Sequence, residues 1–111
     1  MFLDDRTRIR HILDAAREAV DFLDKCQRTD LDTDRKLNLA VVRLLEIIGE
    51  AAYGVSETTK ERYPQIPWHQ MTGMRNRLIH GYFEVNADII WKTVKEDLPA
   101  LIRQLEQLPC L

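Results

Sequence analysis

Apolar residues recur every three or four positions through most of the chain, which is the spacing of amphipathic helices. The first stripe predicts a helix over residues 4–26, with Asp4 or Asp5 as its N-cap, and the second predicts a helix over residues 34–53. The residues expected to be buried are Ile9, Ile12, Leu13, Ala16, Val20 and Leu23 on the first helix, and Leu37, Val41, Leu44, Leu45, Ile48 and Ala52 on the second. The polar stretch between the helices offers the N-cap candidates Asp30, Asp32 and Thr33.

Turn and cap signals separate the apolar stretches of the second half. Ser56 is expected to cap a short helix over residues 57–62. Pro67 suits the first position of a helix predicted over residues 68–80, because its fixed φ matches a helix start. Gly81 then follows that helix as its C′ residue, where a positive φ is needed.

The last segment is predicted to be helical from its N-cap, Asn86, to the end of the chain. Its apolar stripe continues from Ile89 to Leu108, but Pro99 interrupts it. We therefore expect this last helix to kink at Pro99 or to divide there into two abutting helices. No segment alternates between apolar and polar residues with period two, which argues against strands. We therefore predict one all-α domain over residues 1–111, with four main helices in an up-down bundle.

Two features of the second predicted helix have more than one interpretation. Gly49 costs about 1 kcal/mol relative to alanine inside a helix, so it is either a tolerated glycine or a point where another helix approaches closely. Glu46 and Glu50 share one side of this helix with Arg43. They form either a solvated face or a pair of carboxylates that holds a neighbouring arginine.

The composition is that of a folded domain, because 45% of the residues are hydrophobic and 31% are charged. The formal net charge of −2 excludes a general polyanion binder, so any contact with nucleic acid must come from a local patch. No apolar run approaches the roughly 20 residues that span a bilayer. The cysteines, Cys26 and Cys110, lack metal-ligand spacing, and no signal peptide is visible. We therefore expect a cytoplasmic protein with no membrane partner.

Residues 74–82 concentrate the chemistry of the chain, because Arg75, His80 and Tyr82 fit an R-x4-H-x-Y pattern. On a regular helix, Arg75 and His80 would point about 140° apart, whereas Asn76 and Arg77 would share a face with His80. A joint site of Arg75 and His80 then requires that the helix unwinds near Gly81, that the arginine curls round, or that two copies of the chain meet. We favour the last of these, a homodimer.

The side chains of this stretch suit the cleavage of an RNA phosphodiester bond. His80 is expected in the last turn of its helix, where the dipole favours the imidazolium, and an imidazole can transfer protons near neutral pH. Arg75 and Arg77 can hold a phosphate through forked donors, and Tyr82 adds a hydroxyl and a stacking face. No metal or other cofactor is expected, since no metal-ligand cluster is visible. Alternatively, all of these are ordinary surface or packing residues.

The motif and its surroundings resemble the HepT-like branch of the HEPN superfamily. Besides Arg75, His80 and Tyr82, the segments that carry the resemblance are residues 44–52, 66–68, 73–83 and 89–99. The resemblance implies a four- to five-helix bundle of HEPN type that dimerises with both motifs facing one cleft. It also implies a metal-independent endoribonuclease toxin, with Arg75 and His80 as catalytic residues and Asn76 as a polar neighbour.

The resemblance further implies a partner that controls the toxin. A cognate MntA-like nucleotidyltransferase antitoxin would transfer AMP from ATP to Tyr82. We also hypothesise that Glu46 or Glu50 supports the site by orienting Arg75 or Arg77. Two alternatives stand beside the ribonuclease: a non-catalytic HEPN module that binds nucleotides or proteins, and a subunit whose only task is to accept AMP.

Overall fold

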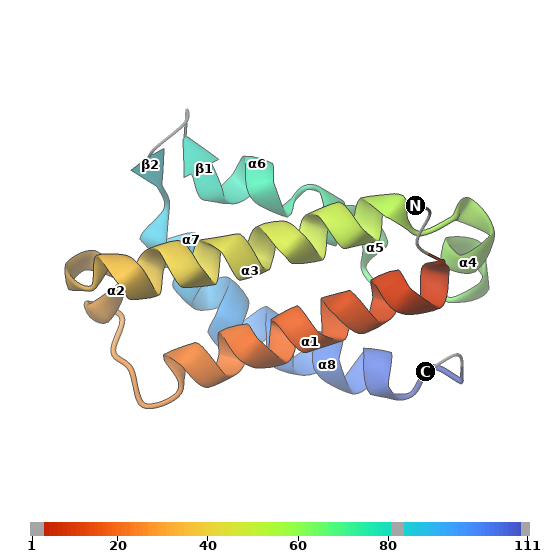
Figure 1. Cartoon of the computed structure of the whole chain (residues 1–111), viewed down its shortest axis with the longest axis horizontal. Coiled ribbons are helices and arrows are strands. Elements are labelled where there is room, and N and C mark those ends of the chain that lie inside the picture. The colour runs from red at the N-terminus through yellow and green to blue at the C-terminus, as the bar shows by residue number, and fades with distance from the viewer. Residues whose placement is uncertain (1–3, 81–83, 110–111) are drawn as a thin grey trace.

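Two long helices form the centre of the computed structural model, which describes residues 4–80 and 84–109, with the backbone alone for His80 (Figure 1). They are α1 (Asp5–Leu23) and α3 (Arg35–Gly54), which run side by side in opposite directions, with the short helix α2 (Asp30–Thr33) in their connection. On the far side of α1 lies α8 (Leu98–Glu106). Between α3 and α8 the chain forms α4 (Glu57–Arg62), α5 (Trp68–Thr72), α6 (Met74–Leu78) and α7 (Ala87–Lys92). The predicted all-α fold is confirmed.

Side-chain caps start α1, α4 and α7 where the sequence suggests. Asp4 accepts a hydrogen bond from the Thr7 amide at 2.7 Å, and Ser56 and Asn86 cap α4 and α7 in the same way. The caps predicted for α3 are wrong. Asp30, Asp32 and Thr33 belong to α2, and Asp34 caps α3 by accepting from the Leu37 amide at 3.1 Å.

The helix predicted over residues 68–80 is broken and ends early. Gly73 is the shared cap of α5 and α6. The His69 carbonyl accepts from both the Gly73 amide at 3.1 Å and the Thr72 hydroxyl at 2.9 Å. After Leu78, strand β1 (Ile79–His80) pairs antiparallel with β2 (Glu84–Val85), with Ile79 opposite Val85. β-branched residues favour such pairing. The predicted C′ residue, Gly81, lies outside the described residues.

The last helix is irregular over the turn that leads into Pro99, where the sequence predicts a kink or two abutting helices. A π-helical turn, η1 (Thr93–Asp97), joins α7 to α8, and Pro99 sits in the first turn of α8. A proline ring collides with the carbonyl four residues earlier and offers no N–H. In the turn before Pro99 the hydrogen bonds span five residues instead of four, since the Leu98 amide donates to the Thr93 carbonyl.

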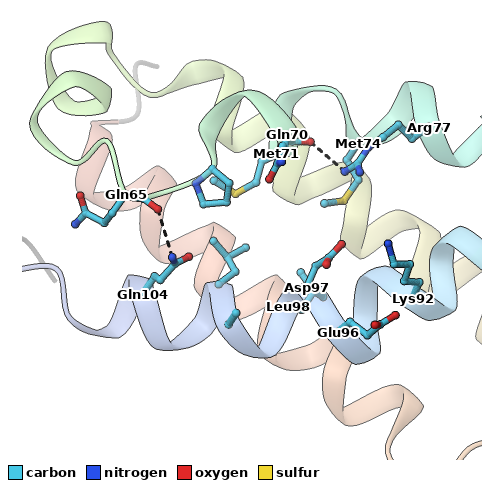
Figure 2. Close-up of a pocket in the computed structure, with 13 residues that line it drawn as sticks. Gln65, Gln70, Met71, Met74, Arg77, Lys92, Glu96, Asp97, Leu98 and Gln104 are labelled. Atoms are coloured by element: carbon cyan, nitrogen blue, oxygen red, sulfur yellow. Dashed lines mark hydrogen bonds between the residues drawn. The ribbon is translucent and has the colours of Figure 1, made fainter.

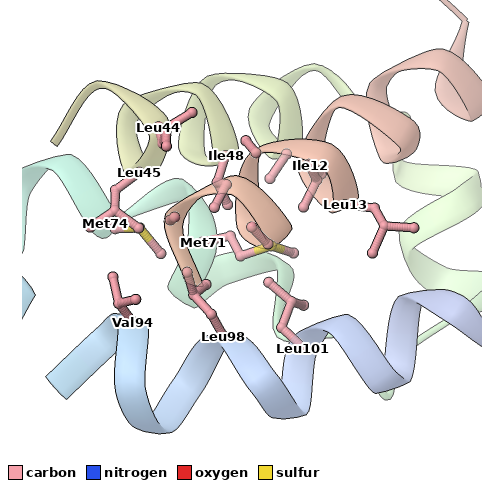
Figure 3. Close-up of a cluster of buried hydrophobic side chains, with 14 of the residues drawn as sticks. Ile12, Leu13, Leu44, Leu45, Ile48, Met71, Met74, Val94, Leu98 and Leu101 are labelled. Atoms are coloured by element: carbon pink, nitrogen blue, oxygen red, sulfur yellow. The ribbon is translucent and has the colours of Figure 1, made fainter. Parts of the chain in front are cut away.

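The predicted apolar stripes form one core between α1, α3 and the C-terminal helices. Every residue predicted to be buried on α1 and α3 lies in it, with Val20 and Leu37 only partly buried at its edge. Figure 3 shows the middle of this core, where α5 and α6 contribute Met71 and Met74. Among the described residues, no helix is long and apolar enough to cross a membrane.

Gly49 marks a close approach of two helices. A Cβ atom at this position would lie 2.9 Å from the Met71 carbonyl oxygen, which is closer than a carbon and a backbone oxygen can come without a shift. The close-approach interpretation of Gly49 is therefore the right one. This contact packs α5 closely against α3. The next helix, α6, also contacts α3, and it contains Arg75.

Candidate functional site

The short helix α6 separates the two arginines of the motif stretch. Residues two apart on a helix point about 160° away from each other. Arg75 turns toward α3, where its Nε lies 3.4 Å from Oε2 of Glu46. Arg77 turns to the opposite side, where its Nη2 donates to the Gln70 carbonyl at 3.2 Å. The two guanidinium groups therefore face different surroundings.

Arg75 is held by a carboxylate and still open to solvent. The side chain of Glu46 is 22% exposed, and that of Arg75 is 57% exposed. A guanidinium whose Nε edge faces a carboxylate keeps its two Nη atoms for a further acceptor, such as two oxygens of a phosphate. This ion pair thus orients Arg75 without closing it off.

Glu50, the other predicted supporting carboxylate, lies at a different arginine. Its Oε1 is 3.5 Å from Nη1 of Arg43, and both side chains are mostly exposed. An exposed pair of this kind contributes little to stability. The structure therefore brings Glu46, not Glu50, to Arg75.

An open groove and a smaller recess meet at the Glu46–Arg75 pair. The groove has a volume of about 540 Å³, follows α3 from Glu46 back to Arg35, and is lined on its other side by Ile79 and Val85. The recess has a volume of about 280 Å³. It is lined by Glu46, Gly49, Glu50, Tyr53, Thr72, Arg75 and Asn76. Asn76, predicted as a supporting residue, therefore lies beside Arg75 in the recess.

Arg77 lines a separate recess of about 450 Å³ between α5, α6 and the C-terminal helices. Figure 2 shows Arg77 above Met74, with Lys92, Glu96 and Asp97 on the opposite wall. Two cations and two carboxylates line this recess, the same balance as in the groove at Arg75. Charge therefore does not distinguish the two places, but they lie on different sides of α6. The prediction that Arg75 and Arg77 hold one phosphate together finds no support in this placement.

His80 follows the helix instead of ending it. Its backbone belongs to β1 and pairs with Glu84, two residues after α6 ends at Leu78. The expectation that His80 sits in the last turn of a helix is therefore wrong, and the 140° separation from Arg75 on a regular helix does not apply. The side chain of His80 and the whole of Tyr82 lie outside the described residues.

Several residues beside the groove were missed by the sequence reasoning. Arg28 donates to Asp88 at 2.7 Å and to Asp32 at 2.9 Å, and these hydrogen bonds raise its pKa. They tie the groove end near α2 to the start of α7. Arg35 and Tyr53 stand 11 and 7 residues from Glu46, spacings that repeat on one helix face and could have been noticed.

Metal ligands do not gather in the part of the chain that the structure describes. Within residues 4–79 and 84–109, no three His, Cys, Asp or Glu side chains lie close enough together to hold a metal ion. The carboxylates near Arg75 are each paired with an arginine: Glu46 with Arg75 and Glu50 with Arg43.

Comparison with known proteins identifies the family. Residues 12–108 match the sequence family described as "Ribonuclease HepT-like". The chain belongs to the HepT-like ribonuclease family. A protein of Thermococcus cleftensis named "Probable ribonuclease HepT" is 42% identical over 100 residues, which cover 86% of this chain and 91% of that protein. "Putative RNase MJ1380" of Methanocaldococcus jannaschii is 35% identical over 103 residues, covering 93% and 94%.

Relatives are also found in bacteria. "Putative RNase TTE0752" of Caldanaerobacter subterraneus is 36% identical over 103 residues, which cover 93% of this chain and 92% of that HepT-like relative. No solved structure gives a significant match. The resemblance to HepT-like proteins that the motif suggested is thereby confirmed.

Proposed function

We propose that this HepT-like chain is a metal-independent endoribonuclease and the toxin of a toxin–antitoxin pair. The observation that carries the proposal is Arg75, a largely exposed guanidinium oriented by Glu46 at the edge of an open groove. Family membership and the ribonuclease names of the relatives support it. We also propose that the chain acts in the cytoplasm as a homodimer whose two motifs face one cleft.

The proposed reaction is attack of the RNA 2′-oxygen on the adjacent phosphorus. The bond from phosphorus to the 5′-oxygen breaks, which leaves a 2′,3′-cyclic phosphate and a 5′-hydroxyl. His80 takes the proton from the 2′-hydroxyl or gives one to the leaving 5′-oxygen. Arg75 binds the phosphate through its Nη atoms and stabilises the extra negative charge of the phosphorane.

Control of the proposed toxin rests on Tyr82. An MntA-like nucleotidyltransferase antitoxin would form a bond between the Tyr82 oxygen and the α-phosphorus of ATP, with pyrophosphate as the leaving group. The transferred AMP carries negative charge two residues from His80. It would occupy the space of the RNA phosphate and offset the charge of Arg75.

Two glutamates on one helix provide a matched test of the role of Glu46 as a positioning residue. We expect Glu46→Gln to lower kcat for RNA cleavage by about tenfold, because the loss of one carboxylate loosens the orientation of Arg75. Glu50→Gln should leave cleavage unchanged, because Glu50 contacts Arg43. KM and the melting temperature should be close to those of the parent in both variants, and Glu46→Asp should restore part of the rate. Equal rates for the two Gln variants would remove Glu46 from the site.

The proposed modification is testable by intact mass. After incubation with an MntA-type nucleotidyltransferase and ATP, the parent should gain the mass of one or more AMP groups and lose RNA cleavage. Tyr82→Phe should gain none. Tyr53→Phe should be modified as the parent is, although Tyr53 is 80% exposed, because we place the acceptor in the motif. Modification of Tyr82→Phe, or its loss in Tyr53→Phe, would contradict the assignment of Tyr82.

A further inference from the structure

One face of α3 carries a straight row of residues past Arg75. Eleven residues of a helix complete about three turns and seven complete about two. Arg35, Glu46 and Tyr53 therefore point the same way from α3, with Leu39 and Val42 between the first two. We call this row, Arg35, Leu39, Val42, Glu46 and Tyr53, the outer row of α3.

The outer row joins the groove to the recess. Arg35, Leu39 and Val42 line the groove, Tyr53 lines the recess, and Glu46 lines both. At a rise of 1.5 Å per residue, the backbone of Arg35 lies about 16 Å before Glu46 and that of Tyr53 about 10 Å beyond it. Arg75 lines both the groove and the recess, so an extended strand that follows them passes Arg35, Arg75 and Tyr53 in turn.

The two ends of the outer row present groups that a nucleic acid strand can use. Arg35 is exposed and has no ion-pair partner within the described ranges, because the nearby carboxylate of Asp32 is paired with Arg28. Tyr53 is 80% exposed, so its ring is available for stacking. Unpaired cations attract phosphates, and exposed aromatic rings stack on bases of any sequence.

The carboxylates beside the row do not oppose a polyanion strongly. Glu46 is paired with Arg75, and Glu50 is paired with Arg43. Each of these two carboxylates therefore lies beside an arginine, whereas Asp32, which lines the groove, shares Arg28 with Asp88. The net result is a track with an unpaired cation at one end, a partly free guanidinium in the middle and an aromatic ring at the other end.

We infer that the outer row of α3 is a track for single-stranded RNA on both sides of the scissile phosphate, with Arg35 contacting a phosphate and Tyr53 stacking on a base. This inference deepens the proposed nuclease function and rests on it. A second copy of the chain is the other occupant to consider. The row has only two largely exposed apolar side chains, Leu39 and Tyr53, and they lie about 21 Å apart along the helix. That is unlike the continuous apolar centre of an interface between copies.

The test measures binding of a single-stranded RNA oligonucleotide with 2′-fluoro groups, which cannot attack the phosphate. We expect Tyr53→Leu to weaken binding about 5- to 100-fold, and Tyr53→Phe, which keeps the ring, to bind as the parent does. Arg35→Gln should weaken binding about fivefold and reduce the slope of log affinity against log salt by about 0.7. Lys36→Gln is the matched control, because Lys36 is exposed but does not line the groove.

The outcomes separate this inference from the proposed function. Parent-like binding by both Arg35→Gln and Tyr53→Leu, with cleavage of ordinary RNA still dependent on Arg75, would overturn the track and leave the nuclease intact. Conversion of a dimer into monomers by these variants, measured by light scattering without RNA, would assign the row to an interface between copies and overturn the track. Binding that depends on Arg35 and Tyr53, in a protein that cleaves no RNA, would support the track and contradict the nuclease.

Discussion

Arg75→Gln should lower RNA cleavage by about 10²- to 10³-fold, the usual cost of removing one group that stabilises charge in a transition state. Arg77→Gln should lower it by less than about threefold, as is usual for an exposed charge that makes no direct contact with the reacting group. The difference follows from α6, which turns Arg75 to Glu46 and the groove and turns Arg77 to the Gln70 carbonyl on the other side. Rates with a fluorescent RNA substrate measure both variants.

This pair of variants carries its own control. Both replace an exposed arginine of the same short helix by the same residue, so an effect on folding or on net charge should appear in both. Equal losses of activity in the two variants would show that the separation of Arg75 and Arg77 by α6 has no functional meaning. Circular dichroism before the assay excludes a folding difference.

Gly49→Ala should lower the free energy of unfolding by about 1 to 3 kcal/mol, although alanine favours a helix over glycine. The added Cβ would lie 2.9 Å from the Met71 carbonyl oxygen, which is backbone and cannot turn away. The strain must separate α3 from α5. Urea unfolding measures the loss directly.

Gly54→Ala is the matched control, at the end of the same helix. There the added Cβ meets the side chain of Arg8, whose far end can move, so the cost should be smaller than at Gly49. Because α5 leads into α6, we also expect Gly49→Ala to reduce RNA cleavage at temperatures where the protein remains folded. If Gly49→Ala is as stable as the parent, the close approach of α5 to α3 at Gly49 is contradicted.

The helices could be predicted from the sequence because their apolar stripes are long and regular. α1 and α3 each show a period of three to four residues over about 20 positions, and all the residues expected to be buried lie in the core or at its edge. The local breaks could not be predicted in the same way. No pattern of apolar residues marks the break at Gly73 between α5 and α6, or the π-helical turn that precedes Pro99.

The site residues stay a prediction. The motif pointed to Arg75, and the structure places this side chain beside Glu46 at an open groove. Which carboxylate meets Arg75 could not be derived, because Glu46 and Glu50 are one turn apart on the same side of α3 and only the position of α6 distinguishes them. Arg75 and Arg77 are close in sequence, which suggested one shared phosphate. Both lie on α6, and its helical turn points them to opposite sides.

The central claim is tested most directly by RNA cleavage in excess chelator, with His80→Ala measured beside the parent. The protein should be produced without a nucleotidyltransferase and shown by intact mass to carry no AMP. We expect the parent to cleave RNA under these conditions, and His80→Ala to be slower by about 10²- to 10⁴-fold. If the folded, unmodified parent leaves several RNAs intact, the nuclease proposal is contradicted, and a binding module or an AMP acceptor takes its place.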